Sequence, residues 1–368
     1  MAEEIILKAG GNVYGGWTKI SVTRSLEAMS GSFDLELTWK WQGNSGQYKA
    51  FMEPIKQGEA CIVEIGGERV ITGYVDDWVP SYDEGQVIIS VSGRDKTSDL
   101  VDCSIDMASG QFNNQTLTQI ANTVCKPFGI KVIVNTDVGA AFPRIQIEQG
   151  ETPHELLSRL ARQRGVLLTS DTLGNLVITR RSKQSAGVSL ILGENVKAAR
   201  GRFSYRQRFS KFKIKAAGAA FGGNWDSAPL SSVGGISAEV TDTEVDRYRP
   251  MIIVNEEITT AEGAAKRGQW ERQRSIAKSN TAEYTVTGWR IPQTGKLWNI
   301  NTLVPVVDEI IGIDEELLIS SVMFSEDNAG RLAVVSVVKP EAFDIPAEAA
   351  KEKQTDIKYS WKKPEGAN

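Results

Sequence analysis

The chain has 368 residues, of which 41% are hydrophobic and 24% are charged, and its net charge is −4. One hydrophobic core does not suit this length, so we expect two to four domains of about 100–150 residues each. The charge argues against a protein that coats nucleic acid, although it leaves room for a local basic patch. No run of residues reaches the ~18 apolar positions that a membrane-spanning helix needs.

The first residues and the cysteines indicate a protein that is made and folded in the cytoplasm. The opening MAEEIILKAG has two acidic residues where a secretory signal peptide carries basic ones. The three cysteines, Cys61, Cys103 and Cys125, are odd in number and far apart, and their spacing fits no metal site. They are expected to be reduced and mostly buried thiols.

Residues 1–95 have the pattern of strands and turns and no convincing helix. Four segments alternate apolar and polar residues as half-buried strands do. They are Ser32–Trp41, Ala60–Ile65, Arg69–Asp76 and Gln86–Ser92. Gly66 and Gly67 fit a tight hairpin between the second and third segments, and Asp83–Gly85 turns the third into the fourth. Consecutive hairpins of this length predict a small antiparallel β-barrel.

Residues 96–182 change character and predict an α/β middle domain between two β modules. A first helix has Asn114 as its cap and Pro127 as its stop, with apolar residues at helical spacing. A second helix begins at Thr152–Glu155, where Thr, Pro and Glu occupy the positions of a capping box. A β-hairpin over 166–180 completes this domain.

Residues 183–279 predict β segments, a long surface loop and a connecting helix. The loop is expected over 218–235, which is rich in Gly, Ser and Ala. Thr259 and Glu262 have the spacing of a second capping box, which opens a helix that runs to about Lys278. One stripe of this helix is small enough for close approach to a neighbour, and its residues are Ala261, Ala264, Ala265 and Gly268.

Residues 280–343 repeat the order of the first barrel and take strands from about 188–216. Their strand-like or apolar segments are Ala282–Trp289, Leu297–Val307, Leu317–Phe324 and Leu332–Val338. An acidic turn with glycine, Glu326–Gly330, joins the last two, as Asp83–Gly85 does in the first barrel. This recurrence predicts a duplicated antiparallel β-barrel, although two unrelated β domains with similar hairpins remain the alternative.

Residues 344–368 are charged and contain proline without an apolar period, so we expect a flexible C-terminal tail. Ile357, Tyr359 and Trp361 alternate near its end, which leaves open that this segment adds a strand to a partner's sheet.

The motifs of common enzymes are missing from the sequence. His154 is the only histidine and is expected to be an exposed residue in the first turn of a helix, and no G-x-S-x-G motif accompanies it. One histidine and three scattered cysteines do not make a zinc site, and neither a Walker loop nor G-x-G-x-x-G occurs. The nine tryptophans are spread along the chain, which favours core and subunit contacts over a sugar-binding face. We therefore expect no catalytic residue, no cofactor and no metal.

One basic stretch, RGRFSYRQRFSKFKIK at 200–215, has basic residues on strand faces with aromatic residues opposite. The candidates for contact with a partner are Arg202, Arg206, Lys211, Lys213 and Lys215. Such a face suits phosphate or an acidic partner, and a solvated strand face is an equally good interpretation.

Several segments resemble the Mu-like tail protein gpP family of phage baseplate hub proteins. They are SVSGRDKTSDLVDCS, TPHELLSRLARQRGVLLTSD, RFSKFKIKAAG, RGQWERQRS and TGWRIPQTGKLWNINTLVPVVD. The likeness runs from EEIILKAGG to about Phe343. More distantly, the family is similar to the T-even phage hub protein and to the N-terminal part of the VgrG spike of type VI secretion.

The resemblance implies a β-rich α+β chain that assembles as a homotrimer. Each chain would give two similar barrels, so that three chains close a pseudo-sixfold ring around a channel. The ring would fit the sixfold tail tube on one side and a membrane-piercing spike on the other. Baseplate wedge proteins are further implied partners, and DNA would pass through the channel only transiently.

The resemblance also implies a place in the virion, in the baseplate of a contractile tail of a phage or prophage. Such a hub is a late structural protein, made in the host cytoplasm, and it is not an enzyme. The basic candidates would then face the channel or a neighbouring subunit. Two other classes stay open, namely an envelope-degrading tail enzyme and a tail module that binds cell-wall carbohydrate.

Overall fold

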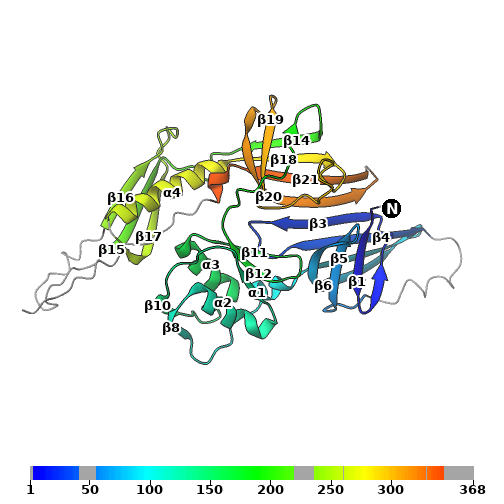
Figure 1. The fold of residues 1–368 in the computed structure, drawn as a ribbon, viewed down its shortest axis with the longest axis horizontal. Coiled ribbons are helices and arrows are strands. Elements are labelled where there is room, and N and C mark those ends of the chain that lie inside the picture. Colours follow the sequence, from blue (N-terminus) through cyan, green and yellow to red (C-terminus); the bar gives the residue numbers. More distant parts are fainter. Residues whose placement is uncertain (1–2, 41–54, 219–235, 260, 329, 344–368) are drawn as a thin grey trace, which may run out of the picture.

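The computed structural model describes residues 3–40, 55–218, 236–259, 261–328 and 330–343, and β-strands dominate it. The molecule is elongated, with a large sheet along one side, an α/β insert beneath it and a helix-covered sheet at one end (Figure 1). Within these residues, no helix is both long and apolar enough to cross a membrane.

The chain begins with seven strands, here called the first module. They are β1 (Ile5–Ala9), β2 (Asn12–Tyr14), β3 (Lys19–Ser25), β4 (Ser32–Lys40), β5 (Ala60–Ile65), β6 (Glu68–Tyr82) and β7 (Gln86–Asp95). Gly66 and Gly67 both have positive φ and form the predicted hairpin between β5 and β6. Cys61, Val63 and Ile65 are buried in β5 and alternate with more exposed residues, which confirms a half-buried strand.

The second module combines strands that lie far apart in the sequence. They are β13 (Leu190–Ile191), β14 (Val196–Phe203), β18 (Asn280–Thr287), β19 (Leu303–Asp308), β20 (Ile313–Asp327) and β21 (Gly330–Val338), followed by a short 3-10 helix, η5 (Pro340–Ala342). Strands β14, β18, β21 and β20 are antiparallel neighbours in that order. The predicted segment from Leu297 becomes a strand only at Leu303, because Leu297 forms an isolated bridge to Arg290.

The two modules are joined edge to edge in one sheet of 13 strands (Figure 1). Its main path is β14-β18-β21-β20-β3-β4-β7-β6-β5-β1-β2, and β13 and β19 pair beside that path. One hydrophobic core serves both modules, with Phe33 and Leu35 from the first and Tyr284 and Phe324 from the second. The sequence predicted two barrels, and the contact between β3 and β20 makes their strands continuous.

The insert has its own hydrophobic core and two small sheets. Its elements are η2 (Lys96–Ser98), α1 (Asp99–Asp102), β8 (Gln111–Gln115), α2 (Leu117–Cys125), η3 (Lys126–Phe128), β9 (Val132–Val134), β10 (Phe142–Gln146), α3 (Pro153–Arg164), β11 (Leu167–Ser170) and β12 (Leu176–Thr179). Thr152 and Glu155 form the predicted capping box of α3. The cap of α2 is Thr116 rather than Asn114, because Asn114 lies in β8 while the Thr116 side chain accepts a hydrogen bond from Gln119 N.

A separate sheet projects from the second module and is covered by one helix. It contains β15 (Lys211–Gly218), β16 (Ile236–Thr241) and β17 (Pro250–Thr259), with α4 (Ala261–Ser279) on one face (Figure 1). A Cβ atom at Gly268 would meet Val240 Cγ2 at 2.8 Å, so the small residue permits the predicted close approach. Of the predicted range 188–216, β13 and β14 lie in the second module, whereas β15 belongs to this separate sheet.

Other predictions fall outside the described residues. They concern most of the 218–235 loop, the side chains of the Thr259–Glu262 capping box and the C-terminal tail from 344 onward. His154 is half-buried rather than exposed, because it lies in a cavity wall with Leu26, Met29 and Trp270.

Candidate interaction surface

The contact between β3 and β20 shows how one module binds another. Six residue pairs run antiparallel from Ser321–Ser25 to Glu326–Ile20. Val22 and Phe324 face each other in this ladder and are 0% and 2% exposed. Strand pairing therefore joins the modules through backbone hydrogen bonds and a shared core at the same time.

The strands on either side of this contact repeat the same geometry in both modules. In the first, β6 pairs with β5 through its first half and with β7 through its second half. In the second, β20 pairs in the same way with β19 and then with β21. A one-residue bulge follows the pair Val75–Gly93 in β6 and the pair Ile319–Val337 in β20. The repeated strand order therefore includes this bulge, and bulges are features that protein families conserve.

Hydrogen bonds hold the bulged residue at both positions. Asp76 accepts from Arg94 Nε at 2.7 Å, and Asp102 accepts from Arg94 Nη2 at 2.7 Å. These hydrogen bonds raise the pKa of Arg94 and lower the pKa of Asp102, so both groups stay charged. In the second module, the bulged Ser320 donates through Oγ to Ser336 O at 3.2 Å.

Within the described residues, the outer edge of β2 is open because β2 pairs only with β1, and two further open edges of the large sheet carry large exposed side chains. One is β14, which ends the sheet and pairs with β18, apart from a bridge between Val196 and Leu192 at its start. The other is the second half of β6, Asp77–Tyr82, which pairs with β7 on one edge alone. Large apolar side chains are exposed at both, namely Val79 at 54%, Tyr82 at 82% and Phe203 at 60%. Exposed edges with such side chains are typical of sheets that bind another strand.

The second half of β6 is a feature that sequence reasoning missed. The predicted strand ended at Asp76, where two adjacent acids interrupt the alternation. The signal was present, because Trp78, Pro80 and Tyr82 continue an every-second-residue pattern as far as the turn at Asp83.

The predicted basic residues do not form one surface. Arg202 is exposed on β14, opposite Thr281 of β18. Arg206 lies beyond the end of β14, so it does not share a strand face with Arg202 as expected. The chain turns after Phe203 because Ser204 Oγ accepts from the Arg206 N–H at 3.3 Å.

The three lysines line the open face of the separate sheet. Lys211, Lys213 and Lys215 alternate with Phe212 and Ile214, whose side chains are buried under α4. Glu239 of β16 lies beside them and contacts Lys211 Nζ at 2.6 Å. This hydrogen bond raises the pKa of Lys211 and lowers that of Glu239, so the face carries charges of both signs.

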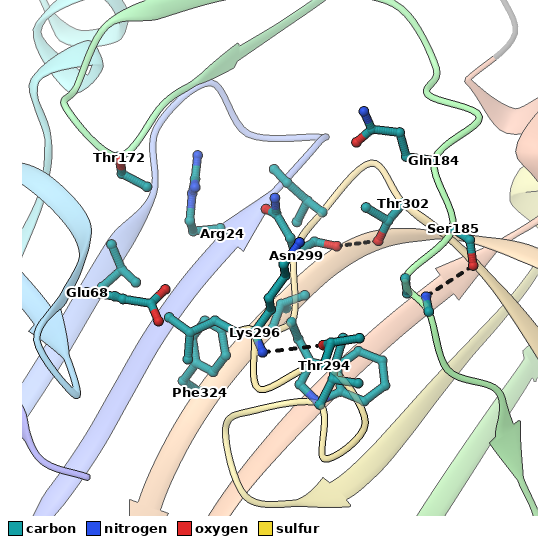
Figure 2. A pocket seen from close by; sticks show the side chains of 18 of the residues that line it. Arg24, Glu68, Thr172, Gln184, Ser185, Thr294, Lys296, Asn299, Thr302 and Phe324 are labelled. Carbon is teal, nitrogen blue, oxygen red and sulfur yellow. Dashed lines mark hydrogen bonds between the residues drawn. The ribbon is translucent and has the colours of Figure 1, made fainter.

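A cavity of about 530 Å³ lies where the two modules meet the insert. Figure 2 shows that Arg24 and Glu68 come from the first module, Thr172 from the insert, and Lys296 and Asn299 from the second module. The guanidinium of Arg24 is bound to Ser170 O, so this cation ties β3 to the insert. The cavity is therefore a junction between parts of the chain.

Within the described residues, no group of three or more His, Cys, Asp or Glu side chains is arranged to hold a metal ion. Burial lowers the pKa of His154 and outweighs the nearby carboxylate of Glu155, which raises it.

Three family models match separate parts of the chain. The model of the N-terminal part of the Mu phage baseplate assembly protein GpP-like group matches residues 4–95. The model of the second domain of the baseplate hub protein gp44-like group matches 97–180. The model of the fourth domain of the Mu phage baseplate assembly protein GpP matches 259–346.

Individual proteins agree with these models. The baseplate hub protein gp44 of Escherichia phage Mu is 36% identical over 354 residues, which cover 95% of this chain and 91% of that protein. The crystal structure of the 43 kDa tail protein of prophage MuSo2 from Shewanella oneidensis is 78% identical, with a TM-score of 0.84 over 93% of this chain and 100% of that one.

A more distant likeness concerns the fold alone. The Escherichia coli protein c3393 is a component of the type VI secretion system that is structurally similar to the T4 tail proteins gp27 and gp5. It is 13% identical to this chain, with a TM-score of 0.55 over 90% of this chain and 76% of that one.

Proposed function

The chain belongs to the family of Mu-like phage baseplate hub proteins, and we propose that three copies of it form the ring at the centre of the baseplate. It is a structural tail protein and not an enzyme. In this proposal, the ring joins the sixfold tail tube of a contractile tail to a threefold membrane-piercing spike. It also leaves a channel through which DNA passes.

The observation that carries the proposal is the repeated strand order with its repeated bulge. One chain holds the strand order β3-β4-β7-β6-β5 and a second, matching order β14-β18-β21-β20-β19, and the two are joined by β3 and β20. Three such chains offer six nearly equal positions, so an object of threefold symmetry can match a partner of sixfold symmetry. A ring of this kind closes through head-to-tail contacts between unlike modules.

The partners follow from the place of the family in the tail. A hub of this kind would contact the spike, the tail tube and the baseplate wedge proteins, and the protein would be made and assembled in the host cytoplasm.

The basic residues remain candidates for the channel or for a neighbouring protein. We expect the lysine face of the separate sheet, formed by Lys211, Lys213 and Lys215, to contact an acidic surface, because among the described residues Glu239 is the carboxylate paired with these three ammonium groups. Replacing all three lysines by alanine should weaken assembly or infectivity. Normal assembly and normal infectivity of that variant would dismiss this role.

The ring is tested on the purified full chain. Light scattering coupled to size exclusion should give three times the chain mass of 40.3 kDa. Averaged electron-microscope images down the symmetry axis should show six similar lobes around a hole. A chain that stays monomeric throughout the micromolar range would overturn the proposed ring.

A further inference from the structure

The contact inside the chain predicts the contact between chains. Following partners across the sheet, Val22 of β3 pairs with Phe33 and Phe33 with Gly93, which lies opposite the last residue of β6 before the bulge, Val75. In the second module, Gly201 of β14 pairs with Ala282 and Ala282 with Val337, which holds the same place beside the bulge in β20. Strand β14 is therefore the counterpart of β3, and β6 is the counterpart of β20.

Of the two equivalent strand contacts, the one between β3 and β20 forms within the chain, whereas the one between β14 and β6 does not. Strand β3 lies against β20 over Ser321–Glu326. The counterpart of that segment is Asp77–Tyr82 in β6, and its free edge lies in the same chain as the free edge of β14. Both belong to one sheet and lie on opposite sides of the β3–β20 contact, so the partner for each edge comes from another copy.

We propose that β14 of one copy pairs antiparallel with Asp77–Tyr82 of the next copy, in the register of β3 on β20. This pairing rests on the proposed ring and is the contact that closes the ring between neighbouring chains. Transferring the observed register gives the pairs Asp77–Ser204, Trp78–Phe203, Val79–Arg202, Pro80–Gly201, Ser81–Arg200 and Tyr82–Ala199.

This register places like side chains on like faces. On one face, Trp78 of β6 lies opposite Phe203 of β14 and Tyr82 lies opposite Ala199, and these positions correspond to the buried face that holds Phe324 and Val22. The exposed rings of Tyr82 and Phe203 would then be covered, which removes apolar area from water.

On the opposite face, the register brings opposite charges together. Arg202 pairs with Val79 and lies diagonal to Asp77, whose carboxylate accepts only from Ser92 Oγ at 3.3 Å among the hydrogen bonds of the described residues. Diagonal neighbours in an antiparallel pair are within reach of long side chains. The basic residue Arg202 therefore contacts a second copy of this chain in the proposed ring.

Pro80 and the exposed carboxylate of Asp77 also fit a β6 edge that stays unpaired. Proline and charged residues are also the means by which proteins keep an edge strand unpaired. In that case β14 would not lie against β6 in the assembled ring. The two interpretations differ in whether Val79 and Arg202 of different copies come into contact.

Cysteine crosslinking distinguishes them. The test variant is Val79→Cys with Arg202→Cys in a Cys103→Ser background, because Cys103 is the exposed native thiol. Directly opposite residues in an antiparallel pair have Cα atoms about 4.5–5.5 Å apart, which a disulfide spans. Mild oxidation should convert most of the chain into a covalent trimer on a denaturing, non-reducing gel, because each chain bonds to two neighbours.

Two control variants show whether the crosslinks report the proposed register between chains. Thr23→Cys with Met323→Cys places the same pair at the contact inside the chain, and it should crosslink without changing the mass. Val79→Cys with Lys197→Cys moves one cysteine five positions along β14, about 16 Å away at 3.3 Å per residue, and should give little trimer. Equal crosslinking of the test variant and this shifted variant would overturn the register.

Light scattering and crosslinking together distinguish a wrong β14–β6 contact from a wrong ring. If light scattering shows a trimer but the test variant forms no interchain disulfide, the β14–β6 contact is wrong and the ring stands. If no trimer exists, both fail.

A second measurement needs no cysteine substitution. Asp77→Arg should raise the concentration at which trimers form, by about two- to fivefold per contact at low salt. Adding Arg202→Asp should reverse that rise, and no rescue would contradict the pairing.

Discussion

Asp95 ties the first module to the insert through a dense set of hydrogen bonds. It is 1% exposed and accepts from Gly31 N at 2.7 Å, Ser170 Oγ at 2.6 Å and Thr97 N at 3.1 Å. Gly31 precedes β4 and Ser170 ends β11, so one carboxylate orders parts far apart in the sequence.

We expect Asp95→Ala to lower the free energy of unfolding by about 3 kcal/mol, because buried donors lose their acceptor. Urea denaturation followed by fluorescence measures the loss. Asp106→Ala, at an exposed position of the insert, is the matched control and should change little. A loss below about 0.5 kcal/mol in Asp95→Ala would contradict this role.

The buried cysteines should make the stability of the folded chain depend on pH. Burial raises the pKa of Cys61 and of Cys125 to about 12. An unfolded cysteine has a pKa near 8.5, so the folded chain keeps these protons when the unfolded chain has lost them. Their contribution to stability is therefore complete below about pH 8.5 and decreases as the pH rises toward 12.

A thiol reagent at pH 8 should accordingly modify one cysteine rapidly in the folded chain, the exposed Cys103. All three should react after unfolding in guanidinium. Cys103→Ser should abolish the fast reaction, and rapid modification of a second thiol in the folded protein would argue against this burial.

The role of a single residue could be predicted from the sequence only where its hydrogen-bond partners lie close to it along the chain. The capping box at Thr152 and Glu155 was predicted because both partners lie within one helical turn. The bonds of Asp95 to Ser170 depend on how two domains meet, which no local pattern encodes.

At the scale of elements, α4 depends on the small residue Gly268. Leucine there would push into Val240 and Ile214 on the sheet below, because even a Cβ atom would lie 2.8 Å from Val240 Cγ2. We expect Gly268→Leu to lower stability by about 1–3 kcal/mol. Gln269→Leu, at the exposed neighbouring position of the same helix, is the control.

Thermal unfolding followed by circular dichroism compares the two variants. Equal melting temperatures for Gly268→Leu and Gln269→Leu would show that α4 does not need this close approach.

The existence of most strands was predictable, but their membership of sheets was not. Alternation in Lys211–Lys215 correctly indicated a strand with one buried face. The same pattern carries no information about its neighbours, so β15 was assigned with β14 although it pairs with β16 and β17. The free edge of β6 escaped prediction for a related reason, since a bulge shifts the alternation by one residue at Asp76.

At the scale of the whole molecule, a single core across two modules has a consequence for folding. Phe324 is 2% exposed on β20, beside the β3 contact, and belongs to the core that both modules share. Phe324→Ala should cost about 3–5 kcal/mol through lost burial and the cavity that remains. Because β3 and β20 pair directly, the loss should spread to both modules.

Hydrogen exchange with mass spectrometry on the full chain tests this coupling. Protection should fall together in β4 and β7 of the first module and in β18 and β21 of the second, while α2 and α3 keep theirs because the insert has a separate core. Leu157→Ala, in the insert core, should give the opposite distribution. If Phe324→Ala exposes only the second module, the modules fold independently, and their edge-to-edge pairing would be an assembly contact that forms after each is complete.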